Sequence, residues 1–221
     1  MKQLADGVWQ LTGFPPHAIN EYLLEDVLVD AGASFSGRQI LKDLRGHELS
    51  AHALTHAHGD HQGASRRVCE ELGLPFWVGE GDADAAERPE LIRERQPDRL
   101  INKVFWKATA GPGREVDRRL TGGDEVAGFQ VLDAPGHSRG HIAFWRAFDR
   151  VLVLGDVMNS HNPLTGFPRG LRLPPDFFTP DPEQNRRSAK RLGELEPKLV
   201  LFGHGPPVRD TKRFVDFTRG L

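Results

Sequence analysis

The sequence has little cysteine, little excess charge and no long apolar run, and each deficit excludes a class of protein. One cysteine, Cys69, cannot form an internal disulfide, which is typical of a reducing compartment. The 29 basic and 31 acidic residues leave a net charge of -2, which gives no electrostatic case for nucleic acid or an anionic membrane as partner. No stretch approaches the roughly 18 apolar residues of a membrane span. Residues 1–11 show no secretory signal, so we expect a cytoplasmic protein without nucleic-acid or membrane partners.

Length and composition predict a single domain over residues 1–221. Of the 221 residues, 38% are hydrophobic and 27% charged, so the chain can bury a substantial core. Strand patterns come first, with a hairpin over residues 21–32, and later strands alternate with helices. This order predicts an α/β protein with mixed sheets rather than a purely parallel sheet.

Turn and cap signals place several elements. Helices are expected over residues 37–44 and 64–74, the second one stopped by Gly73. Asp181 followed by Pro182 predicts the N-terminus of a third helix. The turns "GPGREV" and "LTGGDEV" predict another hairpin between them.

The segment "LTHAHGDHQG", residues 54–63, concentrates three histidines and one aspartate. Residues two apart lie on nearly opposite sides of a helix, but they can share one face at the end of a strand. A glycine then lets the chain turn back, so that the next two side chains converge. Imidazole and carboxylate groups are preferred ligands of borderline transition metals. The segment therefore predicts a metal site that contains His56, His58, Asp60 and His61.

Three later strand ends each supply one more candidate ligand: His137 in "APGHSRGH", Asp156 in "VLGDV" and His204 in "LFGHGP". Loops on a rigid scaffold are where proteins usually place their chemistry. Five histidines and two aspartates exceed the three protein ligands that a catalytic metal with an open position needs. The set therefore predicts two metal ions. Cys69, in a predicted helix, is expected to be a core residue.

The motifs "THAHGDH", "PGHSRGH", "LGD" and "GHG", in this order, resemble those of the metallo-β-lactamase superfamily. The resemblance is to its glyoxalase II-like (hydroxyacylglutathione hydrolase-like) members. The motifs extend over residues 55–205, and Asp30 in "VLVDAG" matches the family's first, buried acidic position. The resemblance implies an αββα sandwich of two mixed β-sheets flanked by helices, with a dinuclear site at one edge.

The resemblance also implies how the ligands divide between two divalent ions. Asp30 would orient a ligand imidazole through its other nitrogen, and His141 would either do the same or pack beneath the site. Zinc is the expected metal, with iron or manganese as alternatives. By motif position the ligands are His56, His58 and His137 for the first ion, Asp60, His61 and His204 for the second, and Asp156 as the bridge.

Such a site predicts hydrolytic chemistry. A hydroxide that bridges two cations is a nucleophile at neutral pH, because metals lower the pKa of bound water from about 15.7 to about 7. Asp156 would hold the bridge, and Asp60 would steer or accept a proton. These two aspartates are the catalytic candidates, and no serine or cysteine nucleophile is then needed.

The long proline-rich segment 158–180 is a candidate pocket wall for a small-molecule substrate, since loops of this length are often functional. A local aromatic cluster and solvated arginines would explain the same residues equally well. The candidate residues are His161, Phe167, Arg169, Phe177 and Phe178.

The ligand set best matches a hydrolase of a small ester or thioester, similar to glyoxalase II. Zinc β-lactamases lack the bridging aspartate that Asp156 supplies. Glyoxalase II proper has a C-terminal helical domain that contacts glutathione, and few residues follow His204 here, which argues against glutathione itself. A lactonase of this superfamily would use a tyrosine beyond the bridging aspartate, whereas the one tyrosine of this chain is Tyr22.

Two other classes stay open. A persulfide dioxygenase resembles glyoxalase II in sequence but holds a single iron, using the positions of His56 and His58 or their neighbours, with His137 and Asp156. A non-catalytic metal-binding module is the weaker alternative, and it predicts a site plugged by side chains. The sequence makes no prediction about oligomeric state.

Overall fold

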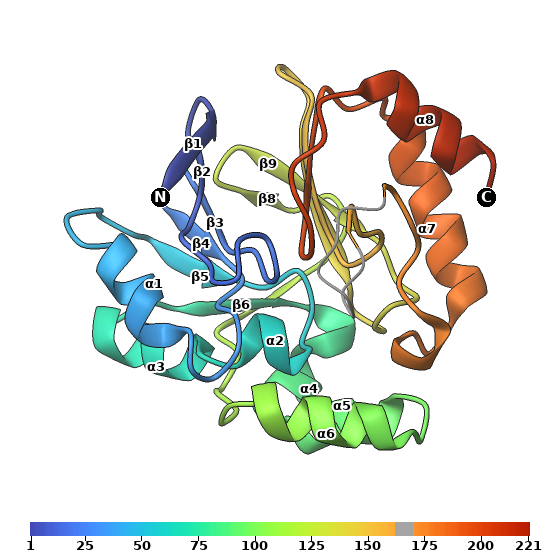
Figure 1. Cartoon of the computed structure of the whole chain (residues 1–221). Helices are drawn as coiled ribbons and strands as arrows, with labels where there is room; N and C mark the ends of the chain where they lie inside the picture. Colours follow the sequence, from blue (N-terminus) through green and yellow to red (C-terminus); the bar gives the residue numbers. More distant parts are fainter. Residues whose placement is uncertain (162–169) are drawn as a thin grey trace.

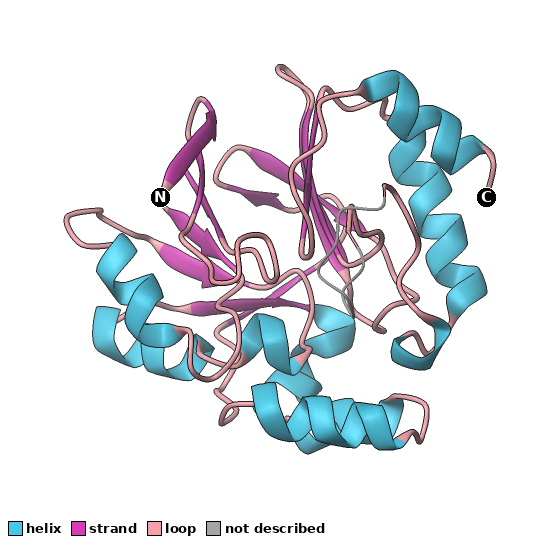
Figure 2. Ribbon diagram, in the orientation of Figure 1, coloured by secondary structure: helices cyan, strands magenta, loops and turns pink. Residues whose placement is uncertain are grey.

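Two β-sheets packed face to face form the centre of the molecule (Figures 1 and 2). The computed structural model describes residues 1–161 and 170–221. The first sheet has seven strands in sequence order, and the second has five in the order β12-β11-β10-β9-β8. The strands are β1 (Lys2–Ala5), β2 (Val8–Gln10), β3 (Tyr22–Leu24), β4 (Val27–Val29), β5 (Ala51–Ala53), β6 (Phe76–Gly79), β7 (Arg118–Leu120), β8 (Glu125–Val126), β9 (Phe129–Asp133), β10 (Ile142–Arg146), β11 (Val151–Gly155) and β12 (Leu199–Phe202).

Both sheets are mixed, as predicted. Strands β1 to β4 pair antiparallel, and β4 to β7 pair parallel. In the second sheet β11 and β12 are parallel, and the other neighbours are antiparallel. The hairpin predicted over residues 21–32 is confirmed as β3 and β4, with Leu23 opposite Leu28.

Alternating side chains explain why the sheets are covered on both faces. In β11, Val151 and Val153 join the core between the sheets, whereas Leu152 and Leu154 join the core beneath the outer helices. Successive side chains of a strand point to opposite faces. An uninterrupted apolar run such as "VLVL" is therefore typical of a strand that is buried on both sides.

Helices cover the outer face of each sheet (Figure 2). On the second sheet, Leu192 of α7 (Pro182–Glu194) and Phe214 of α8 (Thr211–Arg219) pack against Leu152 and Phe202. On the first sheet, Ile40 and Val68 pack against Leu23 and Leu28. The layer order is helix, sheet, sheet, helix, which confirms the αββα architecture. The helices on the side of the first sheet are α1 (Gly37–Asp43), α2 (Gly59–Gln62), α3 (Ser65–Leu72), α4 (Ala83–Glu87), α5 (Glu90–Arg95) and α6 (Leu100–Thr109).

The predicted helix ends agree with the structure. Gly73 ends α3 in the left-handed conformation, with φ of 67°. Asp181 caps α7, because its carboxylate accepts a hydrogen bond from Gln184 N at 2.8 Å and Pro182 occupies the first helical position. In the described part of the chain, no helix combines the length and the apolarity that crossing a membrane requires.

Three local predictions were incomplete or wrong. The hairpin expected between the two glycine-rich turns does not form, because β7 pairs in parallel with β6 in the first sheet while β8 pairs with β9 in the second. Helices α6 and α8 were not predicted. Asp60 and His61 lie on α2 (Gly59–Gln62), a single helical turn, and not on an irregular loop.

Candidate metal centre

Strand ends from both sheets meet at one edge of the sandwich, where the predicted ligands lie. The loop after β5 carries His56 and His58 and leads into α2. From the second sheet, the loop after β9 carries His137, and β11 and β12 are followed by Asp156 and His204. All seven predicted ligands are buried, each with at most 8% of its surface exposed.

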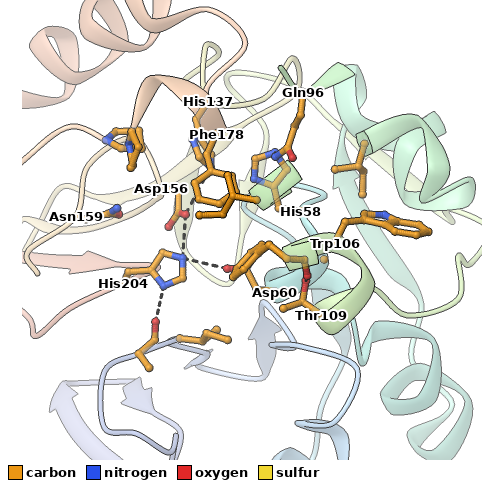
Figure 3. A pocket seen from close by; sticks show the side chains of 18 residues that line it. His58, Asp60, Gln96, Trp106, Thr109, His137, Asp156, Asn159, Phe178 and His204 are labelled. Atoms are coloured by element: carbon orange, nitrogen blue, oxygen red, sulfur yellow. Dashed lines mark hydrogen bonds and ion pairs between the residues drawn. The ribbon is translucent and has the colours of Figure 1, made fainter. Parts of the chain in front are cut away.

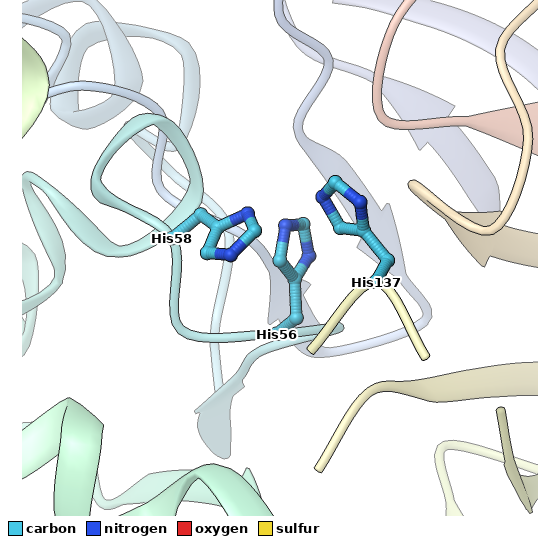
Figure 4. A group of neighbouring side chains, drawn as sticks. All are labelled: His56, His58 and His137. Carbon is cyan, nitrogen blue, oxygen red and sulfur yellow. The ribbon is translucent and has the colours of Figure 1, made fainter. Parts of the chain in front are cut away.

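Three histidines from two loops form the first ligand group (Figure 4). The ring centroid of His58 lies 4.5 Å from that of His56 and 4.5 Å from that of His137. One ligand atom of each ring lies within 4.8 Å of the others. This spacing places three nitrogens around one point, as a single metal ion requires.

A second group combines α2 with the loop after β12. The Nε2 atom of His204 lies 3.1 Å from Asp60 Oδ2, and the Nε2 atom of His61 lies 3.7 Å from the same oxygen. The ligand atoms of these three residues again lie within 4.8 Å of one another. The chain therefore offers two compact ligand groups side by side.

Asp156 lies between the two groups. Its Oδ2 atom is 3.1 Å from His204 Nε2 and 3.5 Å from His137 Nε2, so one carboxylate oxygen faces both groups. The same oxygen is 3.6 Å from His61 Nε2. Gly203 makes this approach possible, because a Cβ atom there would lie 2.1 Å from Asp156 Oδ1.

Each of the five predicted ligand histidines is held by a contact to one ring nitrogen, which leaves the other ring nitrogen to face the predicted metal site. In metal sites the outer nitrogen of a ligand histidine usually bonds a carboxylate, carbonyl or similar group, which fixes the orientation of the ring. The partners are Thr55 Oγ1 for His56 Nδ1 at 3.0 Å, Gln96 Nε2 for His58 Nε2 at 3.0 Å, Asp30 Oδ2 for His61 Nδ1 at 2.9 Å, Thr179 Oγ1 for His137 Nδ1 at 3.2 Å, and the Ala18 carbonyl for His204 Nδ1.

Several side-chain atoms of the predicted ligands have no hydrogen-bond partner in the described structure. They include the Nε2 atoms of His56, His61 and His137 and the Oδ1 atom of Asp156. Leaving a buried polar atom unpaired costs about 1–3 kcal/mol, so four such atoms in one place call for an explanation. Metal ligation supplies one, because these are lone-pair donors of the types that zinc or iron binds. The residues present therefore fit a metal centre.

The histidines of the two ligand groups differ in the direction of their pKa shifts. Burial lowers the pKa of His56 well below its ordinary value, and the neighbouring His61 and His58 act in the same direction. Burial also lowers the pKa of His58 and of His137. The first group is therefore a set of neutral imidazoles, which is the protonation state that binds a metal.

The second group has the opposite balance. Burial alone would lower the pKa of His204, but the carboxylates of Asp156 and Asp60 raise it to about 10. The same two carboxylates and Asp30 raise the pKa of His61 well above its ordinary value against the effect of burial. Without a metal, protons on these two histidines supply the positive charge that the carboxylates attract.

Asp30 lies behind His61, one of the predicted ligands. Its Oδ2 atom accepts hydrogen bonds from His61 Nδ1 at 2.9 Å and from Thr55 Oγ1 at 2.8 Å, and its Oδ1 atom accepts from Thr55 N at 2.8 Å. Thr55 in turn contacts His56 through the same hydroxyl. One carboxylate therefore orients a histidine of each ligand group.

His141 packs beneath the site and does not contact a ligand imidazole through its nitrogens. Its ring stacks on His56 at a centroid distance of 4.8 Å. Its Nε2 atom accepts a hydrogen bond from Asp156 N at 3.1 Å. Burial lowers the pKa of His141 to about 3, so the ring stays neutral and can act as that acceptor. It positions the backbone of Asp156.

Asp82 is a residue at this site that the sequence did not reveal. It ends η1 (Glu80–Asp82) and is 2% exposed. Its carboxylate accepts three hydrogen bonds, from Ala57 N at 3.1 Å, Ser138 Oγ at 2.5 Å and Gly140 N at 2.8 Å. Ala57 lies between two ligand histidines and Ser138 follows a third, so Asp82 joins the loops that carry the first ligand group.

A cavity of about 320 Å³ opens onto the ligands (Figure 3). His58, Asp60, His137, Asp156 and His204 are among the residues that line it. Figure 3 shows the His204 imidazole between the carboxylates of Asp60 and Asp156. The volume is at the lower end of the range of about 300–1,000 Å³ for small-molecule pockets. The cavity also argues against the plugged site that a non-catalytic module predicts.

The residues predicted to form a pocket wall have different positions. Phe178, in η2 (Asp176–Phe178), lines the cavity. Phe177 does not, and its carbonyl accepts a hydrogen bond from Asn102 Nδ2 at 2.5 Å. His161 is buried with its ring centroid 6.3 Å from that of His204, outside the described lining. Phe167 and Arg169 lie outside the described residues.

Comparisons with known proteins agree with this geometry. The model of the metallo-beta-lactamase superfamily matches residues 16–204. The "Probable metallo-hydrolase YflN" of Bacillus subtilis is 30% identical over 200 residues, which cover 82% of this chain and 76% of that protein. A hydroxyacylglutathione hydrolase of Methylococcus capsulatus is 30% identical over 164 residues, 72% of this chain and 49% of that protein. The crystal structure of TTHA1623 in a di-iron-bound form is 32% identical, with a TM-score of 0.69 and coverage of 94% of this chain and 95% of that one.

Proposed function

This chain belongs to the metallo-β-lactamase superfamily, and on that premise we propose that it is a dinuclear metal-dependent hydrolase of a small ester or thioester. The observation that carries the proposal is the pair of ligand groups that share Asp156, with unpaired nitrogens of His56, His61 and His137 turned inward. A single-ion site would leave the second group without a role. A relative with a di-iron centre supports the same number of ions.

We assign His56, His58 and His137 to one ion, Asp60, His61 and His204 to the other, and Asp156 to both. Zinc suits these nitrogen and carboxylate donors, and iron or manganese would accept the same set. The chemistry that bound metals supply is a water molecule whose pKa falls from about 15.7 towards about 7, together with polarisation of the scissile carbonyl.

The chain's own residues bind the substrate, orient the reacting groups and limit access of bulk water. Asp60 lines the cavity and is held by His204, so its carboxylate can orient a water molecule towards a bound carbonyl. The apolar wall of the cavity, which faces the predicted ligands and includes Trp106 and Phe178, displaces solvent from the bound substrate.

Other nucleophiles and other reactions find less support in the structure. Burial raises the pKa of the Cys69 thiol to about 12, and its side chain packs in the apolar core on the outer side of the first sheet. Tyr22, the one tyrosine of the sequence, is buried and donates its hydroxyl proton to the Phe202 carbonyl at 2.7 Å. It cannot serve as the active-site tyrosine that a lactonase of this superfamily would use.

The proposal is tested by elemental analysis of the protein purified without added metal, paired with assays of thioester and ester hydrolysis. We expect two ions per chain and turnover, and we expect Asp156→Ala to lose metal and activity together. Asp6→Ala is the matched control, because Asp6 is exposed and distant in sequence from every ligand. Two ions and full activity in Asp156→Ala would refute the assignment. One iron per chain without hydrolysis would support the persulfide dioxygenase instead.

A further inference from the structure

The wall of the cavity facing the ligands is largely apolar. It is built by α5, by α6, by the segment around η2 and by the loop that precedes β3. The rings of Phe105 on α6 and Phe178 in η2 lie 5.3 Å apart. Polar groups on this side include Gln96, which contacts His58, and Thr109, whose hydroxyl donates to the Phe105 carbonyl. The apolar lining residues are Ala18, Ile19, Ile92, Ile101, Phe105, Trp106, Pro174, Pro175 and Phe178.

No lysine or arginine appears among the described residues that line the cavity. The nearby arginines of α5 are engaged elsewhere. Arg95 forms an ion pair with Asp84, and Arg93 lies over the ring of Trp106 at 5.7 Å. An anionic group placed against this wall would lose its hydration without gaining a cationic partner from the described lining, which is costly.

We propose that the part of the substrate held in this cavity is an uncharged apolar chain or ring, such as a medium-length aliphatic or an aromatic acyl group. The inference rests on the proposed hydrolase function and specifies its substrate class. It sets this chain apart from an enzyme for glutathione thioesters, because the peptide part of glutathione carries two carboxylates and an ammonium group. Ile101 and Phe105 on α6, with Phe178 opposite, determine the specificity.

The first experiment measures kcat/KM for thioesters of one small neutral thiol with acetyl, butanoyl, hexanoyl and octanoyl groups. Burial of each added methylene should raise kcat/KM by up to about fourfold until the cavity is full. A glutathione thioester of the same acyl group should be a poorer substrate than the neutral one. A preference for the glutathione thioester would overturn the inference, and a flat or falling series would show that the cavity does not hold the acyl group.

The apolar chain could belong to the acyl group or to the leaving thiol, so a second series keeps the acetyl group and lengthens the thiol from ethyl to octyl. A rise in the first series alone assigns the cavity to the acyl group, and a rise in the second alone assigns it to the thiol. Both outcomes support an apolar chain, whereas no rise in either series contradicts it.

A pair of substitutions on α6 tests the wall itself. Ile101→Lys places an ammonium group in the lining, so it should lower kcat/KM for the octanoyl thioester at least tenfold and raise it for a glutaryl thioester, which ends in a carboxylate. Leu100→Lys is the matched control, because Leu100 is 77% exposed on the same helix and does not line the cavity. Equal effects of the two substitutions would refute the role of Ile101.

Binding of 2-decanone, an uncleavable neutral analogue, separates failure of this inference from failure of the proposed function. Calorimetry should detect binding to the wild type and at least tenfold weaker binding to Ile101→Lys. If no ester or thioester is hydrolysed but the ketone binds in this pattern, the substrate class stands and the hydrolase assignment fails. Hydrolysis without chain-length dependence and without ketone binding would refute the substrate class alone.

Discussion

Replacement of Asp82 by alanine should destabilise the protein and weaken its metal site together. The Asp82 carboxylate is buried and accepts hydrogen bonds from Ala57 N, Ser138 Oγ and Gly140 N. Two of these donors are backbone amides, which cannot turn away to find another partner. The variant therefore leaves two buried N–H groups unpaired, each at a cost of about 1–3 kcal/mol.

The lost charge-assisted bond from the Ser138 hydroxyl adds to this cost, although the hydroxyl can rotate to another acceptor. We expect the free energy of unfolding to fall by about 3–5 kcal/mol, a large fraction of the roughly 5–15 kcal/mol that stabilises a typical domain. Because Asp82 joins the loops that carry the first three histidines, metal affinity should fall at least tenfold, as for other groups that orient ligands.

Urea unfolding and competition with a chromophoric chelator measure these two effects. Asp84→Ala is the matched control, since it removes the same charge two residues away, from a side chain that is 41% exposed and paired with Arg95. The control should lose less than about 1 kcal/mol and keep its metal affinity. Equal unfolding free energies and equal metal affinities in the two variants would refute the role assigned to Asp82.

Three further substitutions test other features of the structure. Burial lowers the pKa of His52 to about 4 from 6.5, so the neutral ring contributes stability above pH 6.5 that is lost as the pH falls towards 4. In His52→Gln, the free energy of unfolding should therefore fall less steeply between pH 6.5 and pH 4, by roughly 3 kcal/mol in total. An unchanged pH dependence in urea unfolding would contradict this. Gly203→Ala should lose metal on elemental analysis while keeping its circular dichroism spectrum, because the new Cβ would meet Asp156 Oδ1 at 2.1 Å. Gln96→Ala should weaken metal binding about 10- to 100-fold, because it removes the amide that contacts His58. Chelator competition measures this, and an unchanged metal affinity would show that the contact does not orient the His58 ring.

Much of the fold could be predicted because its signals are local. The alternation in β4 and β11, the cap at Asp181 and the stop at Gly73 each depend on a few adjacent residues. The pairing of β7 could not be predicted in the same way, because three residues do not specify which sheet they join. Helix α6 escaped prediction because its apolar residues are largely exposed or face a cavity instead of forming one buried stripe.

The candidate ligands were visible for a different reason. Histidine is uncommon, so "HAHGDH" and single histidines at strand ends stand out against the rest of the chain. The supporting residues do not stand out. Asp82 and Asp84 occur in one short string, "GDADA", yet one is buried with three hydrogen bonds and the other forms an ion pair near the surface. What distinguishes Asp82 is that loops distant in sequence, which carry Ala57, Ser138 and Gly140, fold next to it. The local sequence does not show that these loops come together there.

The division of ligands between the sheets couples metal binding to the closure of the sandwich. The first sheet supplies His56, His58, Asp60 and His61, and the second supplies the other three ligands. Ions held by both sides must therefore stabilise the packed sheets, since a ligand that binds only the folded state adds about RT ln(1 + [L]/Kd) to its stability. Because each proposed ion would be held by residues of both sheets, loss of either ion would loosen this edge of the sandwich, next to the cavity.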